Sequence, residues 1–244
     1  MPRTARASIG GICYHVLNRG NARHDVFHED DDHQRFIELI QEACARVPMR
    51  VLAWCLMSNH FHLVVWPHAD GELSRWMQWL LTSHVRRYHS RYHSSGHVWQ
   101  GRFKAFPLQQ DQHLLTVIRH VERNPLRAGL VGRAEQWPWS SLAGLGQSMV
   151  PSLLHPGPLP RSDDWLNWVN QPQDEAELAA LRTSVERGAP FGSERWQKKT
   201  ARAAWTWNSR YDPAGAHEPR QKSRMSPPFS FSYDCPFSES NDST

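Results

Sequence analysis

Two kinds of hydrophobic spacing alternate along the first half of the chain. Residues 13–19 (CYHVLNR), 50–57 (RVLAWCLM) and 60–66 (HFHLVVW) show the apolar runs and alternation that are typical of strands. Only Ser58-Asn59 separates the second run from the third, which predicts a hairpin of two adjacent antiparallel strands.

Helical spacing fills the intervals between these strands. It covers residues 30–47, 73–92 and 114–121, while residues 98–108 form a broken extended segment. The order β-α-β-β-α-β-α predicts an α+β fold, with a ferredoxin-like βαββαβ antiparallel sheet followed by a site-bearing helix. We expect helices on one face of that sheet and a second face that is free to build a site.

The pattern changes after residue 145. Residues 146–212 are expected to form an irregular, partly helical C-terminal extension, with one helix over 175–187. Residues 213–244 are dominated by Pro, Ser, Gly and charged side chains, which predicts a disordered tail. Residues 8–145 would then be the main domain.

Charge gives only a mild indication of the partner. Lys and Arg number 28 against 24 Asp and Glu, and the pI is about 9.0. Such a balance points to nucleic acid only if the positive charge is clustered, and basic residues do concentrate between Arg75 and Lys104. The 4 cysteines match neither a zinc-finger spacing nor a disulfide framework, and no apolar run is long enough for a membrane span. We therefore expect a cytoplasmic protein with no membrane partner.

The candidate chemistry begins with His60-Phe61-His62. Residues i and i+2 of a strand point to the same face, so both imidazoles would project together while Phe61 faces the other side. Neutral imidazoles suit a divalent cation, which can hold a phosphate oxygen as a phosphodiester bond breaks. Taken alone, the pattern is more typical of two partly exposed strand histidines without a ligand, and the surrounding sequence is needed to favour a metal site.

The surrounding sequence resembles the HUH transposases with a single catalytic tyrosine, especially the REP-associated tyrosine transposases. The resemblance covers roughly residues 12–142, and its blocks occur in order: Tyr14-His15-Val16 with Asn18-Arg19-Gly20-Asn21, Leu52 to Leu63 (LAWCLMSNHFHL), Gly96 to Lys104 (GHVWQGRFK), Glu122 to Val131 (ERNPLRAGLV) and Trp137-Pro138-Trp139-Ser140-Ser141.

This resemblance implies a metal-dependent transesterification on single-stranded DNA or a DNA hairpin, with Mg²⁺ or Mn²⁺. His60, His62 and Asn124 would hold the ion, and the nucleophilic tyrosine would lie four residues before Asn124. His120 occupies that position and lacks the phenol oxygen, so the ordinary attack cannot come from this residue. The family includes monomers and dimers, which leaves the choice between monomer and homodimer open.

Three interpretations of His120 follow. In the first, the protein is an inactivated or repurposed member that still binds DNA. In the second, another nucleophile serves, either Tyr88 or Tyr92 on the basic helix or His120 itself. In the third, His120 admits an activated water, which makes the protein a hydrolytic nuclease. A fourth, metal-independent regulator would use only the basic helix.

Several basic and aromatic residues are candidates for DNA contacts, the basic ones for phosphates and the aromatic one for stacking on an unpaired base. They are Arg19, Arg86, Arg87, Arg91, Arg102, Lys104 and Trp99. A solvated helix face and a core tryptophan would explain the arginines and Trp99 equally simply.

Overall fold

The computed structural model describes residues 8–144 and 153–211, without the side chains of 204–211. Its elements in chain order are β1 (Cys13–Arg19), η1 (Asn21–Arg23), α1 (Asp30–Arg46), β2 (Met49–Met57), β3 (His60–Pro67), α2 (Glu72–Tyr92), β4 (Lys104–Leu108), α3 (Gln112–Glu122), α4 (Asn124–Arg127), η2 (Ala134–Gln136), α5 (Ser141–Gly144), α6 (Trp165–Asn170), α7 (Glu175–Arg187) and α8 (Glu194–Tyr211).

The four strands form one antiparallel sheet in the order β2-β3-β1-β4. The hairpin β2–β3 places β3 in the middle, where it also pairs with β1, and β4 adds to the far side of β1. This order and the helices between the strands confirm the ferredoxin-like βαββαβ arrangement. Only residues 104–108 of the extended segment 98–108 join the sheet as a strand.

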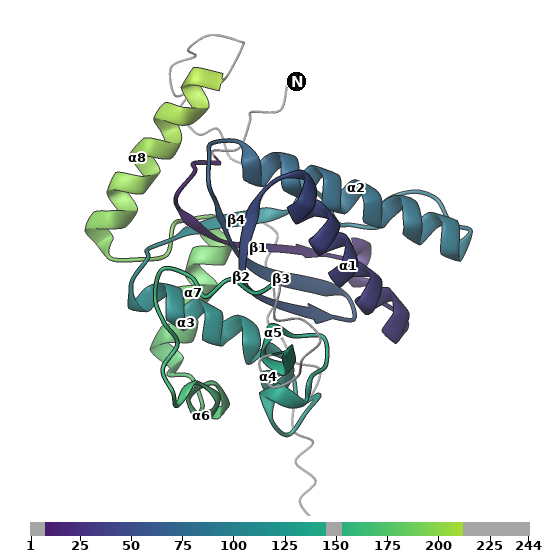
Figure 1. Ribbon diagram of the computed structural model, residues 1–244. Helices are drawn as coiled ribbons and strands as arrows, with labels where there is room; N and C mark the ends of the chain where they lie inside the picture. Colours follow the sequence, from purple (N-terminus) through teal and green to yellow (C-terminus); the bar gives the residue numbers. More distant parts are fainter. Residues whose placement is uncertain (1–7, 145–152, 212–244) are drawn as a thin grey trace, which may run out of the picture.

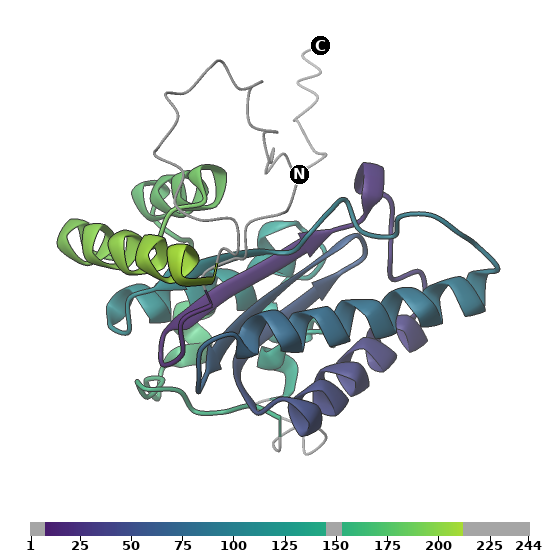
Figure 2. The ribbon, with the colours of Figure 1, turned by 90° about the horizontal axis from the view of Figure 1, so that it is seen from above.

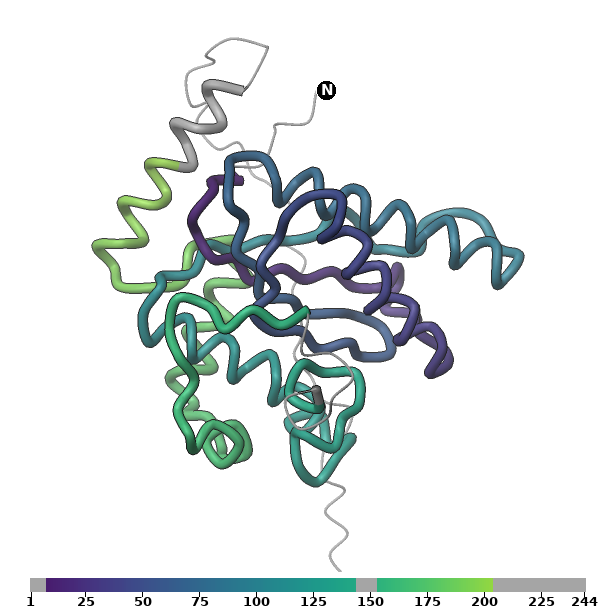
Figure 3. The backbone as a smooth tube through the Cα atoms, in the orientation of Figure 1, coloured from purple at the N-terminus to yellow at the C-terminus, as the bar shows by residue number. Residues whose placement is uncertain are grey.

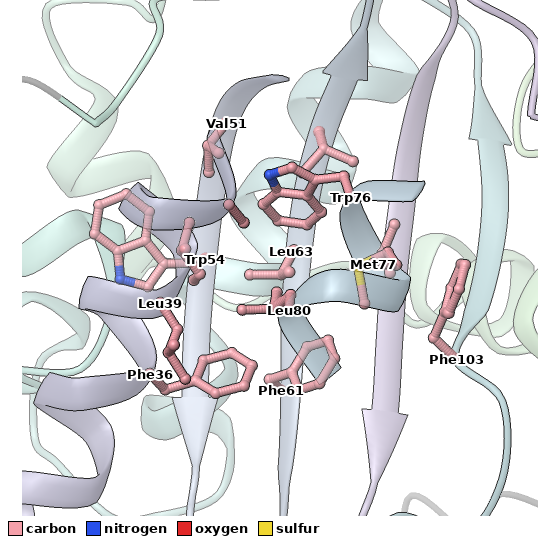
Figure 4. Packing of buried hydrophobic residues seen from close by; sticks show 14 of the residues in the cluster. Phe36, Leu39, Val51, Trp54, Phe61, Leu63, Trp76, Met77, Leu80 and Phe103 are labelled. Carbon is pink, nitrogen blue, oxygen red and sulfur yellow. The ribbon is translucent and has the colours of Figure 1, made fainter. Parts of the chain in front are cut away.

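Helices α1 and α2 cover one face of the sheet, which we call the first face (Figures 1 and 2). The alternating residues Phe61 and Leu63 of β3 point into this layer, where they meet Phe36 of α1 and Trp76 of α2 (Figure 4). These side chains are fully buried, so this layer forms a continuous hydrophobic core.

The second face is covered as well, contrary to the expectation that it would be free. Helix α3 packs on it with Leu114, Val117 and Val121, and the extension adds Trp165 and Val169 of α6. The expectation was wrong because the hydrophobic face of α3 needs an apolar partner, and the sheet supplies it.

The extension runs along both edges of the sheet. Figure 3 follows it from residue 153 past β2 to α6 and α7, which lie beside α3. Leu154 bridges Val51 of β2, and Phe191 bridges Leu108 of β4, so each edge strand has a backbone partner.

The sequence predicted α7 but neither α6 nor α8. The tail predicted to be disordered, 213–244, lies outside the described residues. Within the described ranges, none of the helices combines the length and the apolar character that a membrane crossing requires.

Candidate nucleic-acid and metal site

Strand parity brings three histidines to the second face. His60 and His62 of β3 point there together, whereas Phe61 points into the core of the first face. The register pairs Val64, on the same face as His62, with His15 of β1, so His15 also faces this side. The Nε2 of His15 lies 2.9 Å from the Nδ1 of His62, and the two rings stack at 5.1 Å.

Helix α3 adds a fourth imidazole. His120 is 2% exposed, and its ring centroid lies 6.4 Å from that of His62, with the rings nearly perpendicular. His60 in turn lies 5.1 Å from His62. The residue at the expected nucleophile position and the strand histidines are thus neighbours on one face of the sheet.

All four imidazoles are neutral at physiological pH. Burial lowers the pKa of His15 to about 4 and that of His60 to about 3, and it holds the pKa values of His62 and His120 well below the ordinary value. The positive charge of Arg127 depresses the pKa of His60, His62 and His120 further. The rings therefore keep lone pairs that can coordinate a cation or accept a proton.

The two strand histidines fit a divalent cation. The Nδ1 of His60 lies 2.7 Å from Oδ1 of Asn59, and the Nδ1 of His62 faces His15. When Nδ1–H of His60 donates to Asn59 and Nδ1–H of His62 donates to His15, each ring keeps the lone pair of its Nε2 for a cation. An outer partner on Nδ1 is the usual way in which a ligating histidine is oriented.

Asn124, the expected third ligand, is hydrogen-bonded to Arg127 in this conformation. Its carboxamide oxygen accepts a hydrogen bond from Nη2 of Arg127 at 3.2 Å, and its Nδ2 is buried with no hydrogen-bond partner among the described residues. Within 8–144 and 153–211, no group of three or more His, Cys, Asp or Glu side chains is placed to hold a metal ion. The hydrogen bond from Arg127 occupies one of the two lone pairs of this oxygen, so the other could complete a ligand set with His60 and His62.

Basic residues surround the end of the sheet where this site lies. The register pairs Arg19, the last residue of β1, with His60, the first residue of β3. Lys104, the first residue of β4, pairs with Leu17 on the same face, and Arg102 is exposed in the loop just before it. Three of the predicted phosphate-binding residues thus lie at the same end of the sheet as His60.

The predicted basic residues of α2 lie on the other face. Arg91 forms ion pairs with Glu29 and Asp31 at 2.6 Å, and Arg87 lies 3.8 Å from Asp31. The acidic start of α1 therefore offsets much of the charge that the sequence placed on this helix, whereas Arg86 is exposed.

The predicted alternative nucleophiles lie there too. The Tyr88 hydroxyl lies 2.9 Å from Nε2 of His28, and the Tyr92 hydroxyl donates to Asp32 at 2.5 Å. Both tyrosines belong to the α1–α2 layer, across the sheet from His62. Their hydroxyls therefore do not face the His60–His62 pair of the same chain in this structure.

Trp99 is not available for stacking on a base. It is 6% exposed and packs against Phe27, Phe61 and His84. The core interpretation of this residue therefore holds, because its indole faces are already covered by other rings.

Sequence reasoning missed several residues of the site. His15 could have been found, because it stands on the same face as His62 once the strands are paired. Arg127 belongs to the Asn124-Pro125-Leu126-Arg127 segment, but nothing in the sequence indicated that it would bind Asn124. Gln173 of the extension, whose Oε1 lies 3.3 Å from Nδ1 of His120, gave no signal at all.

The fold and the site together define an α+β domain with a ferredoxin-like sheet and a histidine cluster beneath helix α3. Residues 8–124 match the family model described as Transposase IS200 like. Over these residues, just under half of the chain, the sequence is similar to the IS200-like transposases.

A protein of Haemophilus influenzae (strain ATCC 51907 / DSM 11121 / KW20 / Rd) described as a REP-associated tyrosine transposase is 26% identical over 117 residues, which are 43% of this chain and 66% of the relative. The chain thus spans just under two thirds of that relative's length. A solved structure described as a REP-associated tyrosine transposase bound to a REP hairpin has the same fold, with a TM-score of 0.50 and 18% identity over 64% of this chain and 92% of that one.

Proposed function

We propose that the protein is a transposase-family DNA-binding protein that takes single-stranded or hairpin DNA at the end of the sheet formed by Arg19, His60 and Lys104. One observation carries the proposal: the strand histidines, the residue at the nucleophile position and these basic side chains share one face of the sheet. The relative described as bound to a REP hairpin supports a hairpin as the DNA form.

The basic residues would bind the DNA backbone. Arg19 ends β1 directly opposite His60, and Lys104 begins β4 on the other side of β1; both side chains are half-buried at this end of the sheet. Arg102 is exposed and would meet a phosphate further from the histidines. Together they give the DNA a register relative to His60 and His62.

We propose that His60, His62 and Asn124 hold a Mg²⁺ or Mn²⁺ ion when DNA is bound. When bound, such an ion supplies a Lewis acid that polarises a phosphodiester. The site lies next to the positive charge of Arg127, so a DNA phosphate that binds Arg127 would offset the repulsion between this charge and a cation. Binding of the ion and of DNA would therefore reinforce each other.

Tyrosine-type strand transfer is the ancestral activity in this proposal, and it is lost here. His120 has the place and the neutral ring but no hydroxyl that could form a phosphotyrosine link. Its depressed pKa also makes it a weak base, which argues against efficient activation of a water.

A fluorescently labelled hairpin incubated with the protein and Mg²⁺ or Mn²⁺ tests the proposal. The expected result is binding without cleavage. A covalent protein–DNA adduct would show that strand transfer survives, and cleavage without an adduct would show a hydrolytic nuclease. Binding that is unchanged by removal of the metal and by the double substitution His60→Ala, His62→Ala would show a metal-independent regulator.

The matched pair His120→Tyr and His120→Phe then tests the nucleophile position. Both add an aromatic ring of similar size, but only tyrosine carries a hydroxyl. We expect metal-dependent nicking of the hairpin with His120→Tyr and none with His120→Phe. Nicking by neither variant would mean that other residues of the site have also lost the ancestral chemistry.

A further inference from the structure

The extension is bound to the last turn of α3 by two arginines. The Nη2 of Arg119 donates to the carbonyls of Gln171 and Pro172 at 2.8 and 3.0 Å. The Nη1 of Arg123 donates to the carbonyl of Asn170 at 3.2 Å. These carbonyls belong to the last residue of α6 and to the two residues after it, where the chain leaves the helix and its C=O groups lack helical partners. The guanidinium groups donate hydrogen bonds to these carbonyls and so fix the path of the linker between α6 and α7, residues 171–174.

A buried carboxylate between the two arginines holds the same parts together. Glu122 is fully buried and accepts hydrogen bonds from Trp165 Nε1 at 2.7 Å, Ser141 Oγ at 2.9 Å and Arg161 Nη2 at 3.1 Å. A buried charge needs such partners to offset its lost hydration. The last turn of α3, which carries His120, is therefore packed between the sheet and the extension.

This linker brings Gln173 to the site. Its Oε1 lies 3.3 Å from Nδ1 of His120. A carbonyl oxygen can only accept, so Nδ1 carries the ring proton and Nε2 keeps the lone pair. The Nε2 of Gln173 is buried with no hydrogen-bond partner among the described residues, a cost that an apolar side chain of the same size would avoid.

We propose that Gln173 is a positioning residue of the site, through which the C-terminal extension fixes the tautomer and orientation of His120 against His62. The inference rests on the proposed function, in which His120 belongs to the DNA site. It adds that the site is not complete within residues 8–124, which match the family model, because Gln173 lies outside them.

Nitrogen-15 NMR of the histidine side chains tests this without DNA. His120→Phe identifies the His120 signals by their loss. In the wild type we expect His120 in the Nδ1–H form. Gln173→Leu should shift it toward the Nε2–H form that free imidazole prefers, while Gln173→Glu, which keeps the acceptor oxygen, should restore the wild-type pattern. If Gln173→Leu fails to fold, Gln173→Ala provides the same comparison.

Lys198→Ala is the matched control, because it removes an exposed ion pair with Glu194 on α8 of the same extension. Unchanged His120 signals in Gln173→Leu would overturn the proposal. A shifted tautomer together with an about fivefold weaker affinity for hairpin DNA in Mn²⁺ supports it, since one neutral hydrogen bond is worth about that much. A shifted tautomer with unchanged affinity would restrict Gln173 to a structural role. If the wild type binds no hairpin DNA, the proposed function fails, whereas the tautomer result still stands on its own.

Discussion

The imidazoles of His15, His60, His62 and His120 meet on one face of a sheet, where burial keeps all of them neutral. A neutral ring serves either as a metal ligand or as a packing element, and its outer hydrogen bond decides which nitrogen it offers. His62 is hydrogen-bonded to His15 of the sheet, whereas His120 is hydrogen-bonded to the amide of Gln173 in the extension. The sheet therefore orients one ring and the extension orients the other.

Buried neutral histidines make stability depend on pH. His15 and His84 both have pKa values of about 4, lowered first by burial, whereas the unfolded chain binds protons near the ordinary value of 6.5. Between these values the unfolded state carries more protons, so stability falls as the pH decreases, by about 1.4 kcal/mol per pH unit for each group. We expect the free energy of unfolding, measured in urea between pH 6.5 and 4.5, to fall with this dependence on pH. His84→Phe should remove the contribution of one histidine to that dependence. An unchanged slope in His84→Phe would contradict the assignment.

His15→Phe tests the orientation of His62. The substitution keeps an aromatic ring on β1 but removes the nitrogen that faces Nδ1 of His62. Outer partners of a ligating histidine contribute about tenfold or more to metal affinity, so we expect Mn²⁺-dependent binding of hairpin DNA to weaken by about tenfold. His84→Phe, a buried histidine in the layer across the sheet, should leave this binding unchanged. Equal effects of the two substitutions would show that only core packing had been disturbed.

Among the residues of the site, the sequence predicted those whose direction follows from the alternation of side chains along a strand. His60 and His62 point the same way because they stand two residues apart, and no tertiary information is needed for that. The hydrogen bond between Asn124 and Arg127 depends on side-chain conformations in the last turns before the loop, which no spacing rule specifies. Gln173 lies 53 residues from His120 in sequence, so only the packed chain brings them together.

At the scale of elements, α3 is the piece on which both the site and the extension depend. One side of it packs on the sheet through Val117 and Val121, and its last turn binds the extension through Arg119, Glu122 and Arg123. The position of His120 is therefore determined by two interfaces rather than by the helix alone.

Arg161→Ala should loosen the second interface. It removes the positive partner of a fully buried carboxylate, Glu122, and also a donor to the carbonyl of Leu52. Leaving a buried charge without its partner costs about 3 kcal/mol or more, which urea unfolding would measure. Hydrogen exchange should increase in α6 and α7 as well. Arg182→Ala, at an exposed ion pair, should cost no more than about 0.5 kcal/mol, and a similar cost for both would contradict the interpretation.

The strands and the long helices could be predicted because their periodicity is local. The strand over 13–19 and the helix over 175–187 have the predicted bounds. Helix α6 has only 6 residues and depends on tertiary contacts, since Trp165 donates to Glu122 and the carbonyl of Asn170 accepts from Arg123, the residue that follows α3. Likewise, the burial of the second face follows from an extension whose docking partners lie far away in sequence.

At the scale of the whole molecule, acidic side chains of α1 lie beside the basic side chains of α2, and this bears on where DNA would bind. The sequence suggested α2 as the basic surface because its acidic neighbours in sequence are few. In the folded chain the start of α1 lies beside it, and Glu29 and Asp31 bind Arg91. The end of the sheet that holds His60 instead gathers Arg19 and Lys104 from separate strands.

The salt dependence of hairpin binding distinguishes the two surfaces. Each phosphate contact with single-stranded DNA contributes about 0.7 to the slope of log affinity against log salt, because neutralisation of the phosphate releases counterions. The double substitution Arg19→Ala, Lys104→Ala should therefore weaken binding and lower that slope by about 1.4. The matched pair Arg86→Ala, Arg87→Ala removes the same charge from α2 and should leave the slope nearly unchanged. The reverse pattern would move the DNA to the α1–α2 face, away from His60 and His62, and a protein that binds there could not use the histidines on a phosphodiester.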